Sequence, residues 1–170
     1  LKSAGIDIIE EKREGACTWD ITGKRYIDCQ TGSGIMNVGR CNPEIAAALK
    51  QALDTYDMGV FLLCSRQKAN LAKKLAEIAP GDDLAGVIFG AGGGEANDAA
   101  IKIARGFTMR PGIVYTEKAY HGHTGFSLSA IGREAYREPF EPLMPGFTMV
   151  PFGDLDAMRE AVTDDTAAVI

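Results

Sequence analysis

The 170-residue sequence lacks several features that would place it in a specialised class of protein. Its four cysteines form no Cys-x-x-Cys pair, which argues against a disulfide-stapled secreted domain and favours a reducing cytoplasm. No apolar run approaches the roughly 18 to 20 residues that a membrane span needs. The net charge of −5 and the scattered basic residues argue against a nucleic-acid surface. We therefore expect a cytoplasmic protein with small-molecule partners and neither nucleic-acid nor membrane partners.

Metal ligands are also scarce in the sequence. The only two histidines are His121 and His123, and no further histidine or cysteine accompanies them at the spacing of a metal site. We expect no metal site.

The sequence does contain enough apolar material for a core, since 46% of its residues are hydrophobic and 24% are charged. Residues 16–29 predict a hairpin in which Gly23 supplies a positive φ. Residues 31–39 are punctuated by glycine and predict an ordered loop that either lines a site or merely connects. Helices are expected over residues 43–55 and after Ser65, which can act as a cap.

From Leu84 onward the pattern alternates between strands and helices, which predicts an α/β fold with a sheet covered on both sides. Strands are expected at residues 86–89, 112–116, 147–150 and 167–170. One helix follows the first strand, with a shared face of Ala96, Ala99, Ala100, Ile103 and Ala104; another is capped by Asp154. A buried parallel strand normally leads into a loop and a helix, so we expect the chain to be part of a longer polypeptide.

The run from Val87 to Arg105 reads as a strand, a glycine turn and an amphipathic helix, which is how proteins build anion sites. A dinucleotide fingerprint is out of register, because its third glycine would fall on Glu95 or Asn97. A Walker A loop is excluded because the only Gly-Lys pair is followed by arginine. Two interpretations remain: a site for a compact phosphate monoester, or a turn that only lets the helix pack closely.

The stretch Gly92-Gly-Gly-Glu-Ala-Asn-Asp-Ala-Ala-Ile-Lys-Ile-Ala-Arg105 resembles a motif of the class III pyridoxal-phosphate-dependent aminotransferases, the ω-amino acid and diamine group. That motif is Ser-Gly-x-Glu-Ala-x-Glu-x-Ala-x-Lys-x-Ala-Arg. The resemblance extends along nearly the whole chain, through three further segments: the hairpin of residues 19–28, the turn of residues 37–44, and Tyr120-His-Gly-His-Thr124.

This resemblance implies the fold of a fold type I transferase in incomplete form. Residues 1–57 would be an N-terminal segment with hairpin and helix that belongs to the small domain. Residues 58–170 would be the first part of the large, cofactor-binding domain with its mixed or parallel sheet. The resemblance also implies a homodimer in the full-length protein, with active sites at the subunit interface.

The cofactor that the resemblance implies is pyridoxal 5'-phosphate (PLP). Backbone amides around Gly92, Gly93 and Gly94 would hold its phosphate, and Tyr120 would stack on its pyridine ring. His121 either contacts the cofactor directly or is a packed imidazole that shapes the turn.

Substrate preference is indicated by departures from the family pattern. Gly92 replaces the usual serine, so one hydroxyl donor to the phosphate is missing and cofactor affinity is expected to be lower. His123 stands where N-acetylornithine enzymes typically place an arginine that pairs with the substrate α-carboxylate. We take His123 and Met36 as candidate substrate contacts.

The His123 departure favours a donor whose reacting end is a simple primary amine, and the resemblance implies a 2-oxo acid acceptor such as 2-oxoglutarate. Within the family the chain most resembles putrescine aminotransferases, through segments that include residues 140–146 and 150–153. The acetylornithine, ornithine and 4-aminobutyrate enzymes share the other motifs and remain the alternative.

Transamination also needs a lysine that forms a Schiff base with the cofactor and an acid that keeps the pyridine nitrogen protonated. In the family both lie downstream of the position of Ile170, and no lysine present here matches the catalytic one. We therefore expect no catalytic residue in the chain and no amino transfer from these residues alone. Two other hypotheses stay open: a non-catalytic structural fragment, and a module that binds phosphate without the lysine.

Overall fold

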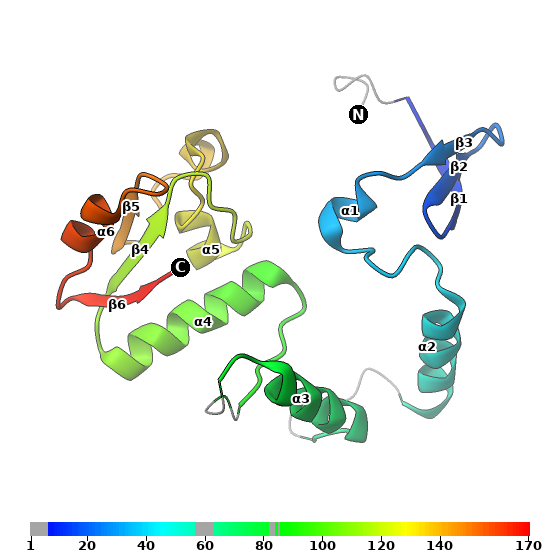
Figure 1. The fold of residues 1–170 in the computed structure, drawn as a ribbon, viewed down its shortest axis with the longest axis horizontal. Helices are drawn as coiled ribbons and strands as arrows, with labels where there is room; N and C mark the ends of the chain where they lie inside the picture. Colours follow the sequence, from blue (N-terminus) through cyan, green and yellow to red (C-terminus); the bar gives the residue numbers. More distant parts are fainter. Residues whose placement is uncertain (1–6, 57–62, 82–83, 85) are drawn as a thin grey trace. The chain divides into compact units, whose positions relative to one another are not determined.

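The computed structural model describes residues 7–56, 63–81, 84 and 86–170. They belong to two compact units, Leu1–Ala69 and Asn70–Ile170, which are described one at a time (Figure 1). The expected division between residues 57 and 58 lies outside the described residues and stays a prediction. Among the described helices, none has the length and apolar character to cross a membrane.

The first unit contains a three-stranded antiparallel sheet in the order β1-β2-β3. The strands are β1 (Glu10–Glu14), β2 (Cys17–Asp20) and β3 (Arg25–Ile27). Cys17 pairs with Ile27 across the predicted hairpin, and Gly23 in its turn has a φ of 83°. The hairpin prediction is confirmed, whereas β1 was not anticipated.

A single carboxylate organises the hairpin turn. One oxygen of Asp20 accepts hydrogen bonds from the Thr22 hydroxyl (2.6 Å), the Thr22 amide (2.9 Å) and the Lys24 amide (3.1 Å). Its other oxygen accepts from the Tyr26 hydroxyl at 2.8 Å. The Thr22 hydroxyl is the largest cause of a pKa for Asp20 lowered to about 2, and it acts with the other donors against burial, which raises that pKa.

We predict that the free energy of unfolding of the first unit falls in acid because of Asp20. The folded-state pKa of about 2 lies below the ordinary value of 3.8, so the stabilisation is complete above the ordinary value and is lost as the pH falls toward 2. Urea unfolding followed by the fluorescence of Trp19, the only tryptophan of these 170 residues, measures this loss. Asp20→Asn should lower stability at neutral pH and show a smaller acid loss. An equal acid loss in both proteins would contradict the assignment.

The loop after the hairpin is held at its ends by a shielded ion pair. Arg40 Nε lies 2.6 Å from Asp28 Oδ2, with both side chains less than 15% exposed. Asp28 also accepts hydrogen bonds from the amides of Gln30 and Thr31. The hydrogen bond from Arg40 is the main cause of a lowered pKa for Asp28. Between these ends lies the short, left-handed α1 (Thr31–Gly34), so the segment is ordered, as expected.

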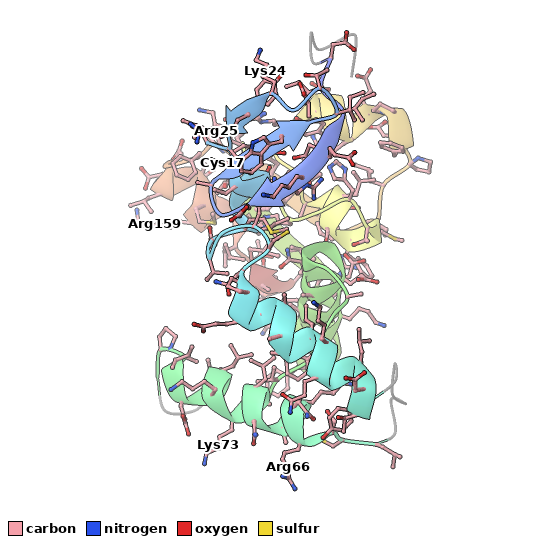
Figure 2. All side chains as sticks on the ribbon, turned by 90° about the vertical axis from the view of Figure 1, so that its right-hand side faces the viewer. Cys17, Lys24, Arg25, Arg66, Lys73 and Arg159 are labelled. Atoms are coloured by element: carbon pink, nitrogen blue, oxygen red, sulfur yellow. The ribbon has the colours of Figure 1, made fainter. Side chains whose placement is uncertain are left out.

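Two amphipathic helices follow, and both begin as the sequence predicts. In α2 (Pro43–Thr55) the side chain of Asn42 accepts hydrogen bonds from two amides of the first turn, and proline occupies the first position. In α3 (Arg66–Ile78) the Ser65 hydroxyl accepts from the Lys68 amide at 3.2 Å. Charged side chains of α3 project into solvent (Figure 2).

The sheet of the second unit has three parallel strands in the order β5-β4-β6. They are β4 (Gly112–Thr116), β5 (Phe147–Val150) and β6 (Thr166–Val169), and the last begins one residue earlier than predicted. The apolar run of Ile113, Val114 and Tyr115 is at most 2% exposed, because β4 is central and covered. The prediction of a parallel α/β sheet is confirmed.

The long helix α4 (Gly93–Thr108) contacts β6 and α5 (Gly125–Ser129), as Figure 1 shows. Its packing face was predicted wrongly. Ile101 is 2% exposed and forms part of the core, whereas Ile103 is 52% exposed. The polar side chains of Asn97 and Asp98 lie on the inward side because α5 and the preceding loop offer them hydrogen-bond partners. Periodicity of apolar residues alone could not show this.

The strand predicted over residues 86–89 is also wrong for the described structure. This segment is irregular, and the side chains of Ile88 and Phe89 are 64% and 44% exposed. A strand exists through hydrogen bonds to a neighbour, and the three described parallel strands do not include this segment. The apolar run therefore indicated strand propensity without a pairing partner.

The remaining elements lie in the connections between the strands of the sheet. They are η2 (Glu134–Tyr136), η3 (Glu138–Phe140) and α6 (Leu155–Ala161), the last capped by Asp154 as predicted. At the far end of α4 the Arg105 guanidinium lies about 5 Å from the rings of Phe126 and Phe147 and donates to the Pro145 carbonyl at 2.8 Å. This clamp holds the helix against the start of β5.

Candidate cofactor site

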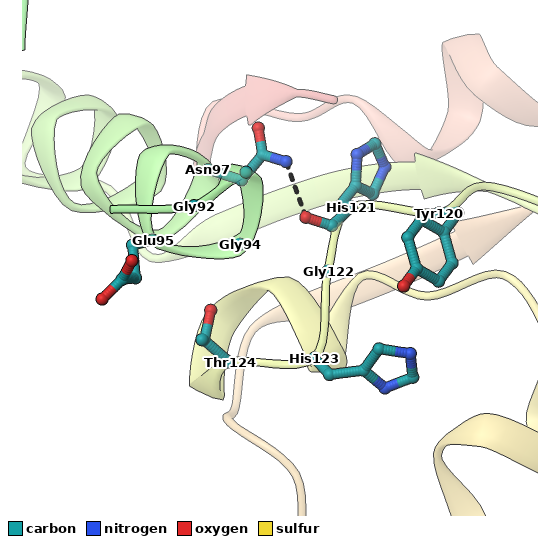
Figure 3. A pocket seen from close by; sticks show the side chains of 10 residues that line it. Gly92, Gly94, Glu95, Asn97, Tyr120, His121, Gly122, His123 and Thr124 are labelled. Atoms are coloured by element: carbon teal, nitrogen blue, oxygen red, sulfur yellow. Dashed lines mark hydrogen bonds between the residues drawn. The ribbon is translucent and has the colours of Figure 1, made fainter. Parts of the chain in front are cut away.

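A pocket of about 540 Å³ opens at the N-terminus of α4. One wall is the first turn of the helix and the other is the loop after β4 (Figure 3). The lining residues are Gly92, Gly93, Gly94, Glu95, Asn97, Tyr120, His121, Gly122, His123 and Thr124. The structure thus brings together every predicted cofactor residue and one of the two predicted substrate residues.

Unpaired backbone donors mark the helix end of the pocket. The first intrahelical hydrogen bond of α4 runs from the Ala96 amide to the Gly92 carbonyl, so the amides of Gly93 and Gly94 have no acceptor within the helix. Gly92 is the N-cap in an extended conformation and offers no side-chain cap. Among the residues that the structure describes, the end of this 16-residue helix therefore presents N–H groups without an acceptor and a partial positive charge to the pocket.

Two glycines let the two walls meet. A Cβ on Gly122 would lie 2.5 Å from the Gly94 Cα, and Gly122 has a φ of 123°, in the region that favours glycine. A Cβ on Gly94 would lie 2.9 Å from the Thr124 hydroxyl oxygen. The glycine of the Tyr-His-Gly-His-Thr motif is thus required by a backbone-to-backbone approach.

Hydrogen bonds tie this loop and α5 to the inner face of α4. Asn97 Nδ2 donates to the His121 carbonyl at 2.7 Å (Figure 3). The fully buried Ser127 lies on α5, with its hydroxyl 2.8 Å from the Gly94 carbonyl and 2.7 Å from Asp98 Oδ1, which also accepts from the Ser127 amide. Burial raises the pKa of Asp98, but these donors outweigh it and leave that pKa lowered, so the carboxylate is charged at neutral pH.

The aromatic side of the pocket combines an exposed ring with a shielded one. Tyr120 is 65% exposed, so its ring is free to cover a flat ligand. Nε2 of His121 is buried and has no hydrogen-bond partner among the described residues, and burial lowers the pKa of this imidazole. His121 is therefore neutral at neutral pH.

The predicted substrate residues have different surroundings. The exposed ring of His123 meets Tyr120 and Tyr136 edge-on, with centroids 5.4 Å and 5.8 Å away. Met36 belongs to the first unit, where it lines a pocket of about 180 Å³ together with Asp28 and Arg40. Its role as a substrate contact stays a prediction.

Comparison with known proteins assigns this arrangement to a family. The profile of the family described as Aminotransferase class-III matches residues 2–170. The chain belongs to the class-III aminotransferase family. Its parallel sheet is accordingly part of the fold type I architecture of PLP-dependent aminotransferases.

Relatives of this class-III aminotransferase chain include an uncharacterized aminotransferase of Archaeoglobus fulgidus, 54% identical over 98% of the chain and 39% of the relative. An acetylornithine aminotransferase of Methanothermobacter thermautotrophicus is 40% identical over 96% of the chain and 41% of the relative. A crystal structure of taurine:2-oxoglutarate aminotransferase from Bifidobacterium kashiwanohense, in complex with PLP and glutamate, superposes with a TM-score of 0.85 at 29% identity, over 95% of the chain and 42% of that protein. The chain thus spans about two fifths of each protein.

Several lining residues of the class-III aminotransferase pocket were not anticipated from the sequence. Asn97, Gly122 and Thr124 all contribute to the contact between the walls, and Glu95 borders the helix end. Gly122 stands inside the Tyr-His-Gly-His-Thr motif that carries the family resemblance, and this position was its signal in the sequence. Asn97 lies three residues after the last glycine of the turn, on a helix, where an asparagine gives no signal of its own.

Proposed function

We propose that the chain is the part of a PLP-dependent aminotransferase that binds the phosphate of the cofactor and covers its pyridine ring. The observation that carries the proposal is the pair of free amides at Gly93 and Gly94, open to a pocket whose opposite wall presents Tyr120 and His121. PLP, when bound, supplies an aldehyde that carries the amino group and a ring that accepts electrons. The donor set fits its phosphate and ring, whereas no lysine lies among the ten lining residues.

Different residues of the chain would bind different parts of the cofactor. The amides of Gly93 and Gly94 and the helix dipole would hold the phosphate dianion, which they favour electrostatically. Tyr120 would cover one face of the pyridine ring and exclude water from it. The neutral imidazole of His121 would pack beside the ring without adding a charge. The lysine and the acid that pairs with the ring nitrogen would come from the remainder of the full-length protein.

The proposed reaction moves an amino group from an ω-amine donor to a 2-oxo acid such as 2-oxoglutarate. An acetylornithine-type donor has the support of the named archaeal relative, which is 40% identical. A simple amine such as putrescine has the support of one observation, the imidazole of His123 at the position where an arginine would grip an α-carboxylate. A homodimer that completes the active site belongs to the same proposal.

Replacing His123 by arginine should separate the two donors. A guanidinium can pair with both oxygens of a carboxylate, whereas imidazole offers one donor, so His123→Arg is expected to raise kcat/KM for N-acetylornithine by about tenfold. The kcat/KM for putrescine, which has no carboxylate, should not rise. Steady-state kinetics of the full-length parent and variant with both donors measures the change in kcat/KM for each donor. A rise for putrescine, or no change for N-acetylornithine, would count against a substrate contact at this position.

The proposed function is tested by incubating the full-length protein with PLP, 2-oxoglutarate and each donor, and by measuring the glutamate formed. We expect glutamate from at least one ω-amine, and none from residues 1–170 alone. Cofactor binding without transfer by the full-length protein would favour a phosphate-binding module instead. A protein that neither binds PLP nor transfers would support the interpretation as a structural fragment.

A further inference from the structure

The loop wall of the pocket has one hydrogen-bonded tether. Of the backbone groups of residues 120–123, the His121 carbonyl has a hydrogen-bond partner within the described structure, and this partner is Asn97 Nδ2 at 2.7 Å. The neighbouring tethers lie outside this segment. Gly132 donates to the Ala119 carbonyl, and Leu128 donates to the Thr124 carbonyl. Ser127 of α5 joins α4 through the Gly94 carbonyl and the Asp98 carboxylate. The four residues that carry the aromatic wall are thus attached to α4 through Asn97.

Steric contact alone cannot supply this attachment. The approach of Gly122 to Gly94 sets a minimum separation between the walls, because overlapping atoms repel. It does not hold the loop inward. The Asn97 amide supplies an attractive contact at a partly buried place, where a hydrogen bond competes less with water than at the surface. Repulsion at the glycines, attraction at Asn97 and the Ser127 hydrogen bonds at α5 together define the width of the pocket, and Asn97 is the contact that acts on residues 120–123 directly.

We infer that Asn97 is a positioning residue for PLP. It acts through the His121 carbonyl and sets the distance between the amides of Gly93 and Gly94 and the ring of Tyr120. The phosphate and the pyridine ring belong to one rigid molecule, so the two walls must be spaced to fit both at once. This inference rests on the proposed function, because it names the residue that matches the pocket to that cofactor.

Two variants and one control test this role in the full-length protein. Asn97→Ala removes the donor and should raise the dissociation constant for PLP about fivefold, as expected for one net hydrogen bond. Asn97→Asp keeps the size of the side chain but places a carboxylate against a carbonyl oxygen, and should weaken binding at least as much. Thr108→Ala is the control, because it removes a 2.7 Å side-chain hydrogen bond at the other end of the same helix. It should leave PLP affinity unchanged.

Three readouts distinguish positioning from general loss of structure. Equilibrium dialysis with PLP gives the dissociation constant, and circular dichroism in the cofactor absorption band reports the orientation of the bound ring. Hydrogen exchange of the cofactor-free protein reports how readily the loop of residues 120–124 opens. In both Asn97 variants we expect a changed cofactor dichroism signal and faster exchange at residues 120–124, with exchange in the rest of α4 as in the parent.

The inference is overturned if Asn97→Ala and Asn97→Asp bind PLP as the parent does, or if Thr108→Ala weakens binding to the same degree. It is also overturned if exchange rises along all of α4, because the side chain would then stabilise the helix as a whole. If the parent protein binds no PLP, the proposed function fails. The exchange experiment without cofactor still decides whether Asn97 tethers the loop.

Discussion

Gly122→Ala is expected to weaken PLP binding at least about hundredfold, the largest loss among the variants considered. The new Cβ would lie 2.5 Å from the Gly94 Cα, which is backbone and cannot swing aside as a side chain does. The φ of 123° adds strain for any residue with a Cβ. The loop must therefore move away from α4, and the amides of Gly93 and Gly94 and the ring of Tyr120 no longer face one ligand.

Gly125→Ala is the matched control for this variant. It lies three residues further along, and its Cβ would meet only the flexible end of Met144, at 3.4 Å. Both variants are compared with the parent by equilibrium dialysis with PLP and by thermal unfolding. We expect Gly125→Ala to bind within about twofold of the parent, as most substitutions away from critical contacts do. Parent-like binding by Gly122→Ala would show that the close approach of the walls is not needed for the cofactor.

Gly92→Ser is expected to tighten PLP binding about thirtyfold, since a hydrogen bond to a charged group contributes about 2 kcal/mol. Gly92 is the N-cap of α4 and has an extended φ of −154°, which a serine adopts without strain. A Cβ there would have only one neighbour within 4 Å, the Glu95 carboxylate at 3.7 Å. The added hydroxyl can therefore donate to a phosphate held at the helix end.

Gly92→Ala separates the hydroxyl from the added carbon. It should bind PLP no more tightly than the parent, because alanine is a poor N-cap and carries no donor. Dissociation constants of the three proteins for PLP, measured at one pH and salt concentration, show whether the hydroxyl or the added carbon changes the affinity. If serine and alanine change affinity equally, the phosphate does not lie within reach of this position.

The local signals in the sequence predicted those elements whose ends are fixed by backbone chemistry. Pro43 starts α2, Asp154 starts α6, and Gly23 turns the hairpin, by a fixed φ, a side-chain cap and a positive φ respectively. The strand prediction for residues 86–89 failed because a strand requires hydrogen bonds to a neighbouring strand. Their apolar character shows propensity for a sheet but cannot specify the partner.

The sequence predicted the features of the candidate site that depend on the local main chain. It did not predict those that depend on contacts between residues far apart in the sequence. Free amides at Gly93 and Gly94 follow from any glycine turn that opens a helix. The tether from Asn97 to His121 joins residues 24 positions apart and became visible only with the fold. Met36 was named as a substrate contact, and its role stays a prediction.

The most direct test of the central claim is a crystal structure of the full-length protein grown with PLP. We predict that phosphate oxygens lie within hydrogen-bond distance, about 2.7–3.2 Å, of the amide nitrogens of Gly93 and Gly94. The pyridine ring should lie against Tyr120, with the Asn97 hydrogen bond to the His121 carbonyl in place. A phosphate bound elsewhere, or a ring that does not touch Tyr120, would contradict the account.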